Sequence, residues 1–286
     1  MRHEPTTGSA PLVGTGREAE IFAFGEGRVV RVLRGRDGRR RLEREASVMA
    51  TVRSTGLPVP DVYEIVDVDG RPGLVMDRVD GSDLLTSLSR RPWKFVGAAR
   101  DLGRAQARLH EVVAPSGLPE LRSELRDRVE TVPHLASELR SHALALLAQL
   151  PDSDRVCHGD FHPGNVIFTA TGPVIIDWTG ATRGDPTGDL ARTILILRLA
   201  AMPADMSPWL RAADRVGRRL FRRIWLRGYR GARAVNCEQL QQWETVCAAA
   251  RLGEGIAEEV PALLALLEQR YERGGGTSRS RRVASR

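Results

Sequence analysis

The sequence is almost without lysine and has few cysteines. Lys94 is the only lysine, so 42 of the 43 basic residues are arginine (43 minus 1). The three cysteines include no C-x-x-C pair, so neither a disulfide framework nor a cysteine–zinc site is indicated, and we expect reduced thiols. No apolar run approaches the roughly 20 residues that span a bilayer, and residues 1–14 lack the apolar core of a secretory signal. We therefore expect a cytoplasmic protein with no membrane partner.

The charge of the chain is strongly basic, with a formal net charge of +7 and a pI near 10.2. Such a chain suggests a nucleic-acid partner when its basic residues gather in one patch with aromatic residues between them. Here the arginines run from Arg2 to Arg286, which indicates a bias of the whole chain, and we expect no specific nucleic acid. The densest run, within residues 211–227, predicts a solvated helix face. A binding stripe, for RNA for example, is the alternative.

The length of 286 residues exceeds the usual size of a single hydrophobic core, so we expect two lobes with a cleft between them. Apolar runs separated by glycine turns predict five short strands, and apolar residues at helical spacing predict one helix after the third. The strands are expected over residues 12–16, 18–24, 28–33, 62–70 and 72–81, and the helix over 39–52. The pattern from about residue 82 to 272 is mainly helical.

These patterns predict an α+β, two-lobed fold. Residues 1–80 would form a small antiparallel sheet with one helix, residues 81–273 a larger, mainly α-helical lobe, and residues 274–286 a disordered tail. In the second lobe, residues 93–112 predict a helix with one stripe formed by Val96, Ala99, Leu102, Gln106 and Leu109. The helical pattern is interrupted at residues 155–178 by a polar loop with short apolar strands around it, and chemistry usually lies in such an interruption.

The polar loop reads HGDFHPGN and contains Asp160 and, five residues later, Asn165. Kinase catalytic loops use this spacing, because phosphoryl transfer needs a carboxylate that accepts or orients the proton of an attacking hydroxyl and an amide oxygen that ligates Mg²⁺. Asp177 follows at the end of an apolar strand, where a second hard oxygen ligand could reach the same metal. We predict Asp160 as the catalytic base and Asn165 and Asp177 as the metal ligands.

Each of these residues alone has an ordinary explanation as an Asx turn or a strand cap, and their joint occurrence favours the catalytic interpretation. His158 precedes the acid, and we expect its imidazole to hold the loop by packing and hydrogen bonding. An alternative interpretation takes His158, Asp160 and His162 as an H-x-D-x-H metal cluster of a hydrolase. The other histidines show no spacing that converges on this loop.

Three segments follow one another along the chain, HGDFHPGN, IIDW and GDPTGDLA. With them the chain resembles the aminoglycoside phosphotransferase and choline kinase-like superfamily, over roughly residues 12–265. These are small-molecule kinases with a protein-kinase-like fold. Protein kinases normally have a lysine two residues after the catalytic acid, and His162 at that position favours the small-molecule branch. In GDPTGDLA we expect Asp185 and Asp189 to brace the loop and not to touch ATP.

The resemblance also implies a nucleotide site. VGTGREAEIF is similar to the family's nucleotide-binding loop, in which Gly14 and Gly16 let the backbone approach phosphate. LVMDRVDG resembles the segment between the lobes that binds adenine. Met76 would lie behind the adenine, and the backbone of Asp77 and Val79 would form its hydrogen-bonding edge.

One position departs from the family pattern. The third strand normally carries a lysine that binds the ATP phosphates and pairs with a glutamate of the next helix, whereas this chain has Arg31 there, with Glu45 as the expected partner. A guanidinium is a planar, permanently charged donor that could reach the phosphates. An edge-strand arginine that points to water is the alternative.

The expected activity is transfer of the γ-phosphate of ATP, with GTP as the alternative donor, to a hydroxyl of a small molecule, with Mg²⁺ as cofactor. An aminoglycoside- or macrolide-like antibiotic, an amino alcohol or a sugar would be the acceptor. Residues 200–286 contain 16 arginines and 9 acids, which argues mildly against a strongly cationic acceptor. We expect the acidic cluster Glu254, Glu258 and Glu259 to be a solvated helix face, with amine binding as the alternative. The competing hypothesis is a catalytically weak, kinase-like regulatory protein that binds nucleotide.

Overall fold

A computed structural model describes residues 10–16, 19–35, 38–199 and 208–274. The predicted disordered tail, apart from Gly274, lies outside these residues. Contacts divide the chain into two compact units. The first unit comprises Met1–Phe95, Val112–Leu118 and His158–Ala181, and the second Val96–Glu111, Pro119–Cys157 and Thr182–Arg286. The polar loop therefore belongs to the same unit as the N-terminal strands, and so do all the predicted site residues.

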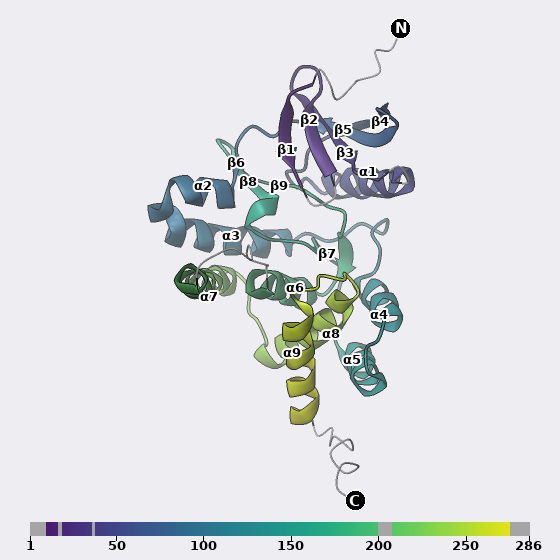
Figure 1. The fold of residues 1–286 in the computed structure, drawn as a ribbon, viewed down its shortest axis with the longest axis vertical. Helices are drawn as coiled ribbons and strands as arrows, with labels where there is room; N and C mark the ends of the chain where they lie inside the picture. The colour runs from purple at the N-terminus through teal and green to yellow at the C-terminus, as the bar shows by residue number, and fades with distance from the viewer. Residues whose placement is uncertain (1–9, 17–18, 36–37, 200–207, 275–286) are drawn as a thin grey trace, which may run out of the picture. The chain divides into compact units, whose positions relative to one another are not determined.

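Five antiparallel strands form the sheet of the first unit, in the order β1-β2-β3-β5-β4 (Figure 1). The strands are β1 Leu12–Thr15, β2 Ala19–Ala23, β3 Arg28–Leu33, β4 Val62–Val68 and β5 Arg71–Asp77. One helix, α1 Arg39–Arg53, follows β3 in the chain. The predicted five strands, the helix after the third strand and the α+β class are confirmed.

β3 is the middle strand of this sheet, and its alternation decides which side chain reaches α1. One side of the sheet carries a buried apolar cluster formed by Phe22, Val30, Val32, Val68 and Val75. Successive side chains of a strand point to opposite faces, so Arg31 projects away from its neighbours in this cluster. On that face it meets Glu45 of α1.

A second, three-stranded sheet in the first unit supports the polar loop, with the order β6-β8-β9. Its strands are β6 Ser82–Asp83, β8 Val166–Thr169 and β9 Gly172–Ile175. Asp83 also caps helix α2, Leu84–Arg90, by accepting a hydrogen bond of 3.0 Å from the Thr86 N–H. The short helix η1, Pro92–Lys94, follows α2, and η2, Pro163–Asn165, precedes β8. The two-residue strand β6 has no clear pattern in the sequence.

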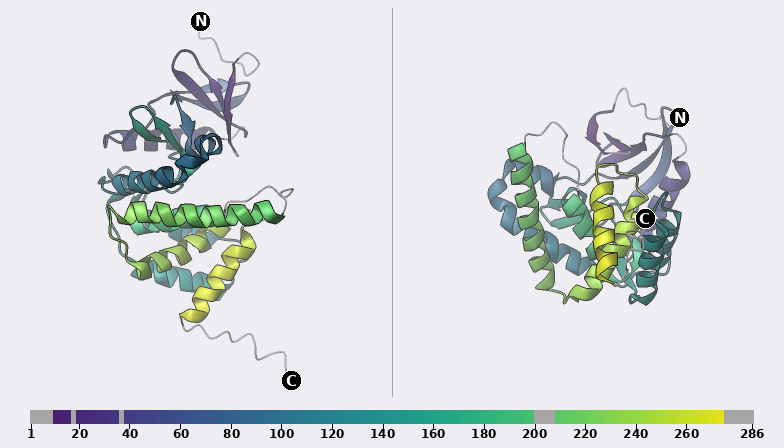
Figure 2. Two further views of the ribbon diagram at one scale, coloured as in Figure 1. Left: turned by 90° about the vertical axis from the view of Figure 1, so that its left-hand side faces the viewer. Right: turned by 60° about the horizontal axis from the view of Figure 1, so that its bottom comes forward.

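The second unit is mainly helical, as the sequence predicts. Its helices are α3 Phe95–Leu109, α4 Leu121–Thr131, α5 Ser137–Gln149, α6 Pro186–Leu199, α7 Pro208–Arg230, α8 Cys237–Leu252 and α9 Val260–Arg273. A small antiparallel pair, β7 Arg155–Cys157 and β10 Thr182–Gly184, lies beside them. α7 is the long green helix in the left view of Figure 2 and continues unbroken for 23 residues.

α3 and α7 cross with their backbones in contact. A Cβ on Gly103 would lie 2.1 Å from the Trp225 carbonyl oxygen, and a Cβ on Gly228 would lie 2.4 Å from the Arg100 carbonyl oxygen. Both positions therefore require glycine, because any side chain would separate the helices. The predicted apolar stripe of α3 is confirmed apart from Val96, which is 48% exposed.

A buried polar network joins α3, α6 and α7. His110 contacts Asp189 Oδ2 at 2.9 Å through Nε2 and the Tyr229 hydroxyl at 2.8 Å through Nδ1. Asp189 also accepts a hydrogen bond from Gln106, and Asp185 accepts one from the Thr187 N–H at the start of α6. Asp185 and Asp189 thus brace the beginning of α6. No helix among the described residues is long and apolar enough to cross a membrane.

Candidate active site

The polar loop, residues 158–165, is packed against the segment 177–181. Gly159 has a φ of +78°, and a Cβ there would lie 2.2 Å from the Gly180 carbonyl oxygen. Conformation and close approach both exclude a side chain at this position. The glycine of HGD therefore allows the two loops that carry the acids to touch, and no sequence pattern marked Gly180 as its neighbour.

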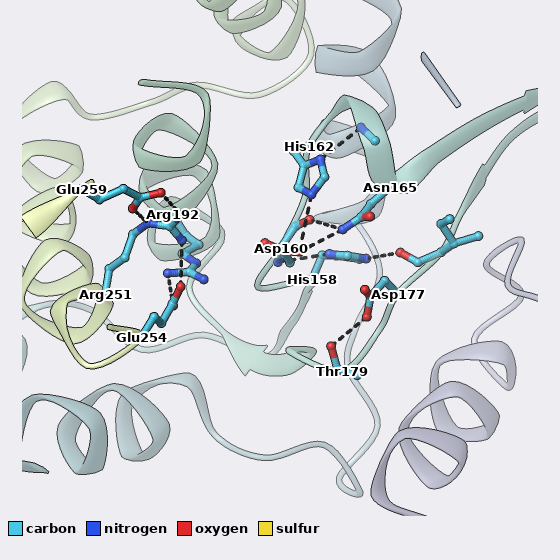
Figure 3. A network of polar contacts seen from close by, with 12 residues as sticks. His158, Asp160, His162, Asn165, Asp177, Thr179, Arg192, Arg251, Glu254 and Glu259 are labelled. Carbon is cyan, nitrogen blue, oxygen red and sulfur yellow. Dashed lines mark hydrogen bonds and ion pairs between the residues drawn. The ribbon is translucent and has the colours of Figure 1, made fainter. Parts of the chain in front are cut away.

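His158 is completely buried beneath the loop (Figure 3). Its Nδ1 accepts a hydrogen bond from the Asp160 N–H at 3.2 Å, and its Nε2 donates to the Ile176 carbonyl at 3.1 Å. The ring contacts Trp178, with centroids 4.7 Å apart. These contacts fix the Nε2–H tautomer and leave neither ring nitrogen for a metal, which argues against the H-x-D-x-H cluster. His158 instead links the acid to the strand that leads to Asp177.

Asp160 presents a carboxylate that is oriented but accessible, with 36% of its side chain exposed. Asn165 Nδ2 donates to Asp160 Oδ2 at 3.0 Å and to the Asp160 carbonyl oxygen at 2.9 Å. Nε2 of His162 lies 3.5 Å from the same Oδ2. A carboxylate held in this way has a defined direction and still meets solvent, as a group that receives a substrate proton must.

The orientation of His162 is set by the backbone of the loop. Its Nδ1 accepts a hydrogen bond of 3.0 Å from the Gly164 N–H at the start of η2, so the neutral ring carries its proton on Nε2, toward Asp160. A Cβ on Gly164 would lie 2.9 Å from His162 Cε1. The glycine in HPGN thus makes room for the imidazole beside the acid.

Asn165 and Asp177 lie on neighbouring segments, joined by a hydrogen bond of 3.0 Å from the Ile176 N–H to the Asn165 carbonyl oxygen. Because the Asn165 amide nitrogen is bound to Asp160, its side-chain oxygen is the atom that can ligate a metal. Asp177 lies two residues beyond β9, not at the strand end as predicted, and has a φ of +61°. Such uncommon backbone conformations in non-glycine residues concentrate at functional sites.

Thr179 is a contact that the sequence analysis missed. Its hydroxyl donates a hydrogen bond of 2.8 Å to Asp177 Oδ1 (Figure 3). The two residues are separated by one position in the chain, so the DWT sequence is the signal that could have suggested the contact.

Arg31 joins three elements of the first unit. Its Nη1 hydrogen-bonds to both carboxylate oxygens of Glu45, and its Nη2 lies 3.7 Å from Asp177 Oδ1. The side chain of Arg31 is 12% exposed, and β3 is an inner strand, so the alternative of an edge-strand arginine in water is wrong. The predicted pair with Glu45 is present, and the contact with Asp177 adds a link that the sequence did not indicate.

Glu45 is almost completely buried, with 2% of its side chain exposed. Burial raises the pKa of the Glu45 carboxyl from 4.5 to about 7, because desolvation of the charged form outweighs the attraction of Arg31. The negative charge of Asp177 raises it further. Glu45 therefore takes up a proton much more readily than an exposed glutamate does.

The predicted nucleotide-binding residues lie in the strands of the five-stranded sheet of the same unit or within two residues of a strand end. Gly14 is in β1, and the Gly16 N–H donates to the Ala19 carbonyl oxygen at 2.8 Å, which closes the β1–β2 hairpin. Residues 17 and 18 of the predicted loop lie outside the described part of the chain. The tip of this hairpin is consequently only partly described.

Met76 and Asp77 end β5, and Val79 follows. The Asp77 N–H donates to the Asp61 carbonyl oxygen at 2.9 Å, and the Asp77 carboxylate accepts from the Tyr63 hydroxyl at 2.6 Å. The Asp77 N–H is therefore engaged within the sheet, and the role of the Asp77 and Val79 backbone in binding an adenine edge stays a prediction.

The acidic cluster predicted as a solvated helix face lies instead in the connection between α8 and α9, and two of its members are ion-paired. Arg251 binds Glu259 through two nitrogens, at 2.5 and 2.7 Å, and Glu254 at 3.0 Å. Arg192 of α6 also binds Glu254, at 2.6 Å (Figure 3). Glu254 and Glu258 are exposed, whereas Glu259 is 3% exposed, so the prediction of a solvated helix face was wrong for Glu259 and for the element that carries the cluster. Sequence alone does not show that arginines from two helices neutralise these acids.

The donor set of the loop suits Mg²⁺. Asn165 and Asp177 offer hard oxygen atoms, and this ion usually takes one or two protein oxygens and completes its coordination with phosphate and water. No group of three histidine, cysteine, aspartate or glutamate side chains that could hold a metal by itself occurs among the described residues. The fit is therefore to a metal that arrives with a phosphate ligand.

The sequence matches the model of a family described as the phosphotransferase enzyme family, over residues 10–243. The chain belongs to this family. It is accordingly a phosphotransferase, a small-molecule kinase, and the polar loop, the metal-ligand candidates and the five-stranded sheet all lie within the matched residues. A search of curated protein sequences finds no match.

Solved structures of related phosphotransferases have the same fold. Amicoumacin kinase hAmiN in complex with AMP-PNP, Ca²⁺ and Ami is similar at 13% identity and a TM-score of 0.59, covering 93% of this chain and 89% of that one. Macrolide 2'-phosphotransferase MphH from Brachybacterium faecium has 20% identity, a TM-score of 0.53 and coverages of 92% and 90%. The GDP and kanamycin complex of APH(2")-IIia has 19% identity, a TM-score of 0.55 and coverages of 91% and 92%. The predicted protein-kinase-like fold is confirmed.

Proposed function

We propose that this phosphotransferase transfers the γ-phosphate of ATP to a hydroxyl group of a small molecule, with Mg²⁺ and with Asp160 as the catalytic base. The observation that carries the proposal is the joint hydrogen bonding of Asp160 and Asn165, which holds a proton acceptor and a metal-ligand candidate on one rigid loop. Positioning and charge stabilisation supply most of the acceleration of phosphoryl transfer. The loop supplies the positioning.

The oxygen of the acceptor hydroxyl forms a bond to the γ-phosphorus, and the bond from that phosphorus to the bridging β–γ oxygen breaks. Asp160 receives the proton that the hydroxyl loses. Asn165 and His162 both contact Oδ2, so they fix the direction in which the carboxylate faces. His158 contributes from below, through the Asp160 N–H. We assign Asp160 the chemical role and the two histidines positioning roles.

Asn165 and Asp177 would hold Mg²⁺, and the bound ion would stabilise the negative charge of the phosphates during transfer. Thr179 orients Asp177 through its hydrogen bond to Oδ1. The Ile176–Asn165 backbone bond keeps the two ligand residues side by side. The chain therefore supplies two oxygen ligands of fixed direction and no closed metal cage.

Arg31 takes the place of the family's phosphate-binding lysine. Glu45 holds one end of the guanidinium, while Nη2 lies 3.7 Å from Asp177, so the group spans the distance from α1 to the metal-binding acid. A lysine ammonium is a single point charge, whereas a guanidinium presents a fork of donors that can serve a carboxylate and a phosphate together. Gly14 and Gly16 would bring backbone N–H groups to the same phosphates, and Met76, Asp77 and Val79 would bind the base.

The acceptor is proposed to be neutral or weakly basic. Glu254 and Glu259 are held by Arg192 and Arg251 and are not available to bind the amines of a polycationic acceptor. Relatives named for macrolide and amicoumacin phosphorylation share the fold, which makes such hydroxylated antibiotics suitable first substrates to test. Relatives in complex with an ATP analogue and with GDP make both ATP and GTP donors worth comparing.

Calorimetric titration with Mg·ATP and Mg·GTP, followed by a phosphorylation screen over macrolides, amicoumacin-like compounds, aminoglycosides, amino alcohols and sugars, tests the proposal. We expect nucleotide binding and a product heavier by one phosphate group, both absent in the control without Mg²⁺. Binding of nucleotide without any turnover that depends on Asp160 would favour the regulatory, catalytically weak alternative. Absence of Mg-dependent nucleotide binding would overturn the proposed function.

A further inference from the structure

One face of the second unit is densely basic. We call it the arginine face and define it by seven exposed arginines of two helices, which are Arg100, Arg104 and Arg108 of α3 and Arg215, Arg219, Arg223 and Arg227 of α7. Each of the two helices contains one acidic residue, Asp101 in α3 and Asp214 in α7. These acids are paired with Arg104 at 3.5 Å and with Arg218 at 2.6 Å. The face therefore keeps a large surplus of positive charge.

A groove of about 650 Å³ runs between the two helices of this face. Its walls include Arg100, Arg104 and Arg108 from α3, and Leu220, Ile224 and Arg227 from α7. Arginines four residues apart on a helix repeat about every 6 Å along its axis. The contact between α3 and α7 at Gly103 and Gly228 joins the two helices, so the charged walls are part of one packed structure. The groove thus offers a row of guanidinium groups to a surface with several anions.

Aliphatic side chains protrude among these arginines. Val96 is 48% exposed, Val216 63% and Leu220 48%. The aromatic residues of the described part of α7, in contrast, are turned inward, since Phe221, Trp225 and Tyr229 are at most 8% exposed. Single-stranded nucleic acids bind on aromatic stacking platforms, which these residues do not provide. Exposed aliphatic groups surrounded by arginines are instead the pattern of an amphipathic surface that lies in a membrane interface.

We propose that the arginine face docks on an anionic phospholipid surface. The guanidinium groups of the arginine face would bind the lipid phosphates, and Val96, Val216 and Leu220 would enter the boundary between headgroups and acyl chains. Clusters of four to eight basic residues on an amphipathic helix bind anionic leaflets in this way. The expectation of no membrane partner considered only spanning segments and signals, which such peripheral binding does not need. The proposal does not depend on the phosphoryl-transfer site.

Co-sedimentation of the full-length protein with vesicles tests this inference. Vesicles of phosphatidylcholine alone are compared with vesicles in which part of the lipid is phosphatidylglycerol. We expect binding to the anionic vesicles only, weakened by salt. Arg219→Gln/Arg223→Gln should weaken it about 25-fold, since each arginine near an anionic leaflet contributes about fivefold. Arg126→Gln/Arg128→Gln on the exposed side of α4 is the matched charge control and should change binding much less.

The aliphatic residues separate lipid docking from simple charge attraction. Val216→Ser/Leu220→Ser keeps every arginine but removes apolar side-chain area that would enter the lipid. The variant should therefore bind anionic vesicles about tenfold more weakly than wild type. Circular dichroism and thermal unfolding check that each variant is folded, which is expected since these side chains are exposed. Failure to bind anionic vesicles at low salt overturns the proposal. So does unchanged vesicle binding in the serine variant, or stronger binding to duplex DNA or RNA than to vesicles.

Discussion

Two networks of polar side chains in this protein hold carboxylates with different partners (Figure 3). In the connection between α8 and α9, Glu259 is 3% exposed and bound by two nitrogens of Arg251. In the two loops of the candidate active site, Asp160 and Asp177 remain about a third exposed. They accept hydrogen bonds from neutral donors, the Asn165 amide and the Thr179 hydroxyl, and Nη2 of Arg31 lies 3.7 Å from Asp177, beyond hydrogen-bond distance.

Exposure and partner type thus differ between carboxylates that stabilise the fold and carboxylates that could take part in chemistry. A carboxylate that is buried against a guanidinium has exchanged its water for a permanent partner and cannot take a metal or a substrate proton without breaking that pair. A carboxylate oriented by neutral groups keeps its charge available. Exposure and the type of partner, more than the presence of an acid in a sequence cluster, therefore distinguish the candidate functional carboxylates from the structural ones here.

The largest effect is expected at Asp160. Asp160→Asn keeps the size and most contacts of the side chain but removes the proton acceptor, so kcat should fall about a thousandfold. The affinity for Mg·ATP should stay within about threefold of wild type. Steady-state kinetics on the acceptor found in the screen and calorimetry measure the two quantities. Near-normal turnover would show that the exposed carboxylate is not the base.

The paired network should respond in stability and not in activity. Glu259→Gln leaves Arg251 without one of its buried partners and should lower the free energy of unfolding by about 3 kcal/mol. The matched control Glu258→Gln changes an exposed side chain and should be within about 0.5 kcal/mol of wild type. Urea denaturation gives both values. A rise in the acceptor KM of Glu259→Gln, with stability unchanged, would mean that this network is a substrate site after all.

Glu45 lies between the two cases, because it is buried and arginine-paired yet belongs to the active-site unit. Its pKa of about 7 when folded, against 4.5 unfolded, means that the folded protein binds the extra proton between these pH values. Glu45 should therefore make the protein less stable as the pH rises from about 4.5 to 7, by up to about 3 kcal/mol. Thermal unfolding of Glu45→Gln across this range should show a flatter pH dependence than wild type.

The control for this experiment is Glu43→Gln on the same helix, where the side chain is 54% exposed. It should leave the pH dependence as in wild type. Identical curves for wild type and Glu45→Gln would show that Arg31 keeps Glu45 ionised throughout, which would place it with Glu259 as a permanently paired acid.

The proposed metal ligand Asp177 gives the fourth comparison. Asp177→Asn removes the charged oxygen and should weaken Mg·ATP binding roughly a hundredfold. Thr179→Val keeps the carboxylate and removes only the hydrogen bond that orients it, for an effect of about threefold to tenfold. Calorimetry in the presence and absence of Mg²⁺ measures both. Equal losses in the two variants would mean that orientation by the hydroxyl, and not the charge of Asp177, limits metal binding.

Much of the fold was predictable because local patterns are strong in the first unit. β-branched runs separated by glycine turns located β1 to β5, and the HGDFHPGN loop marked the acid and the amide. β6 was not predicted, since a two-residue strand is defined only by its pairing with β8. The exposure of Val96 was also missed, because amphipathic spacing places it on the apolar stripe while α7 leaves it open to solvent.

The acidic cluster shows most clearly where sequence reasoning stopped. The spacing of Glu254, Glu258 and Glu259 suggested a solvated surface, but their surroundings include Arg192, which is more than sixty residues away in the chain. Long-range pairing of this kind leaves no local pattern. The same limit applied to Arg31, whose pair with Glu45 was predicted but whose approach to Asp177 was not.

The sequence by itself determined the type of chemistry, because phosphoryl transfer requires a carboxylate, an amide and a second carboxylate at a spacing that a short loop and a hairpin provide. It also determined the order of strands and helices, since hydrophobic periodicity is a local property. Only the tertiary structure decided which carboxylates are neutralised in buried ion pairs and which remain accessible to a metal or a substrate. Burial and ion pairing depend on which segments meet in space, and their energies are set by desolvation and distance, neither of which can be obtained from the positions of residues along the chain.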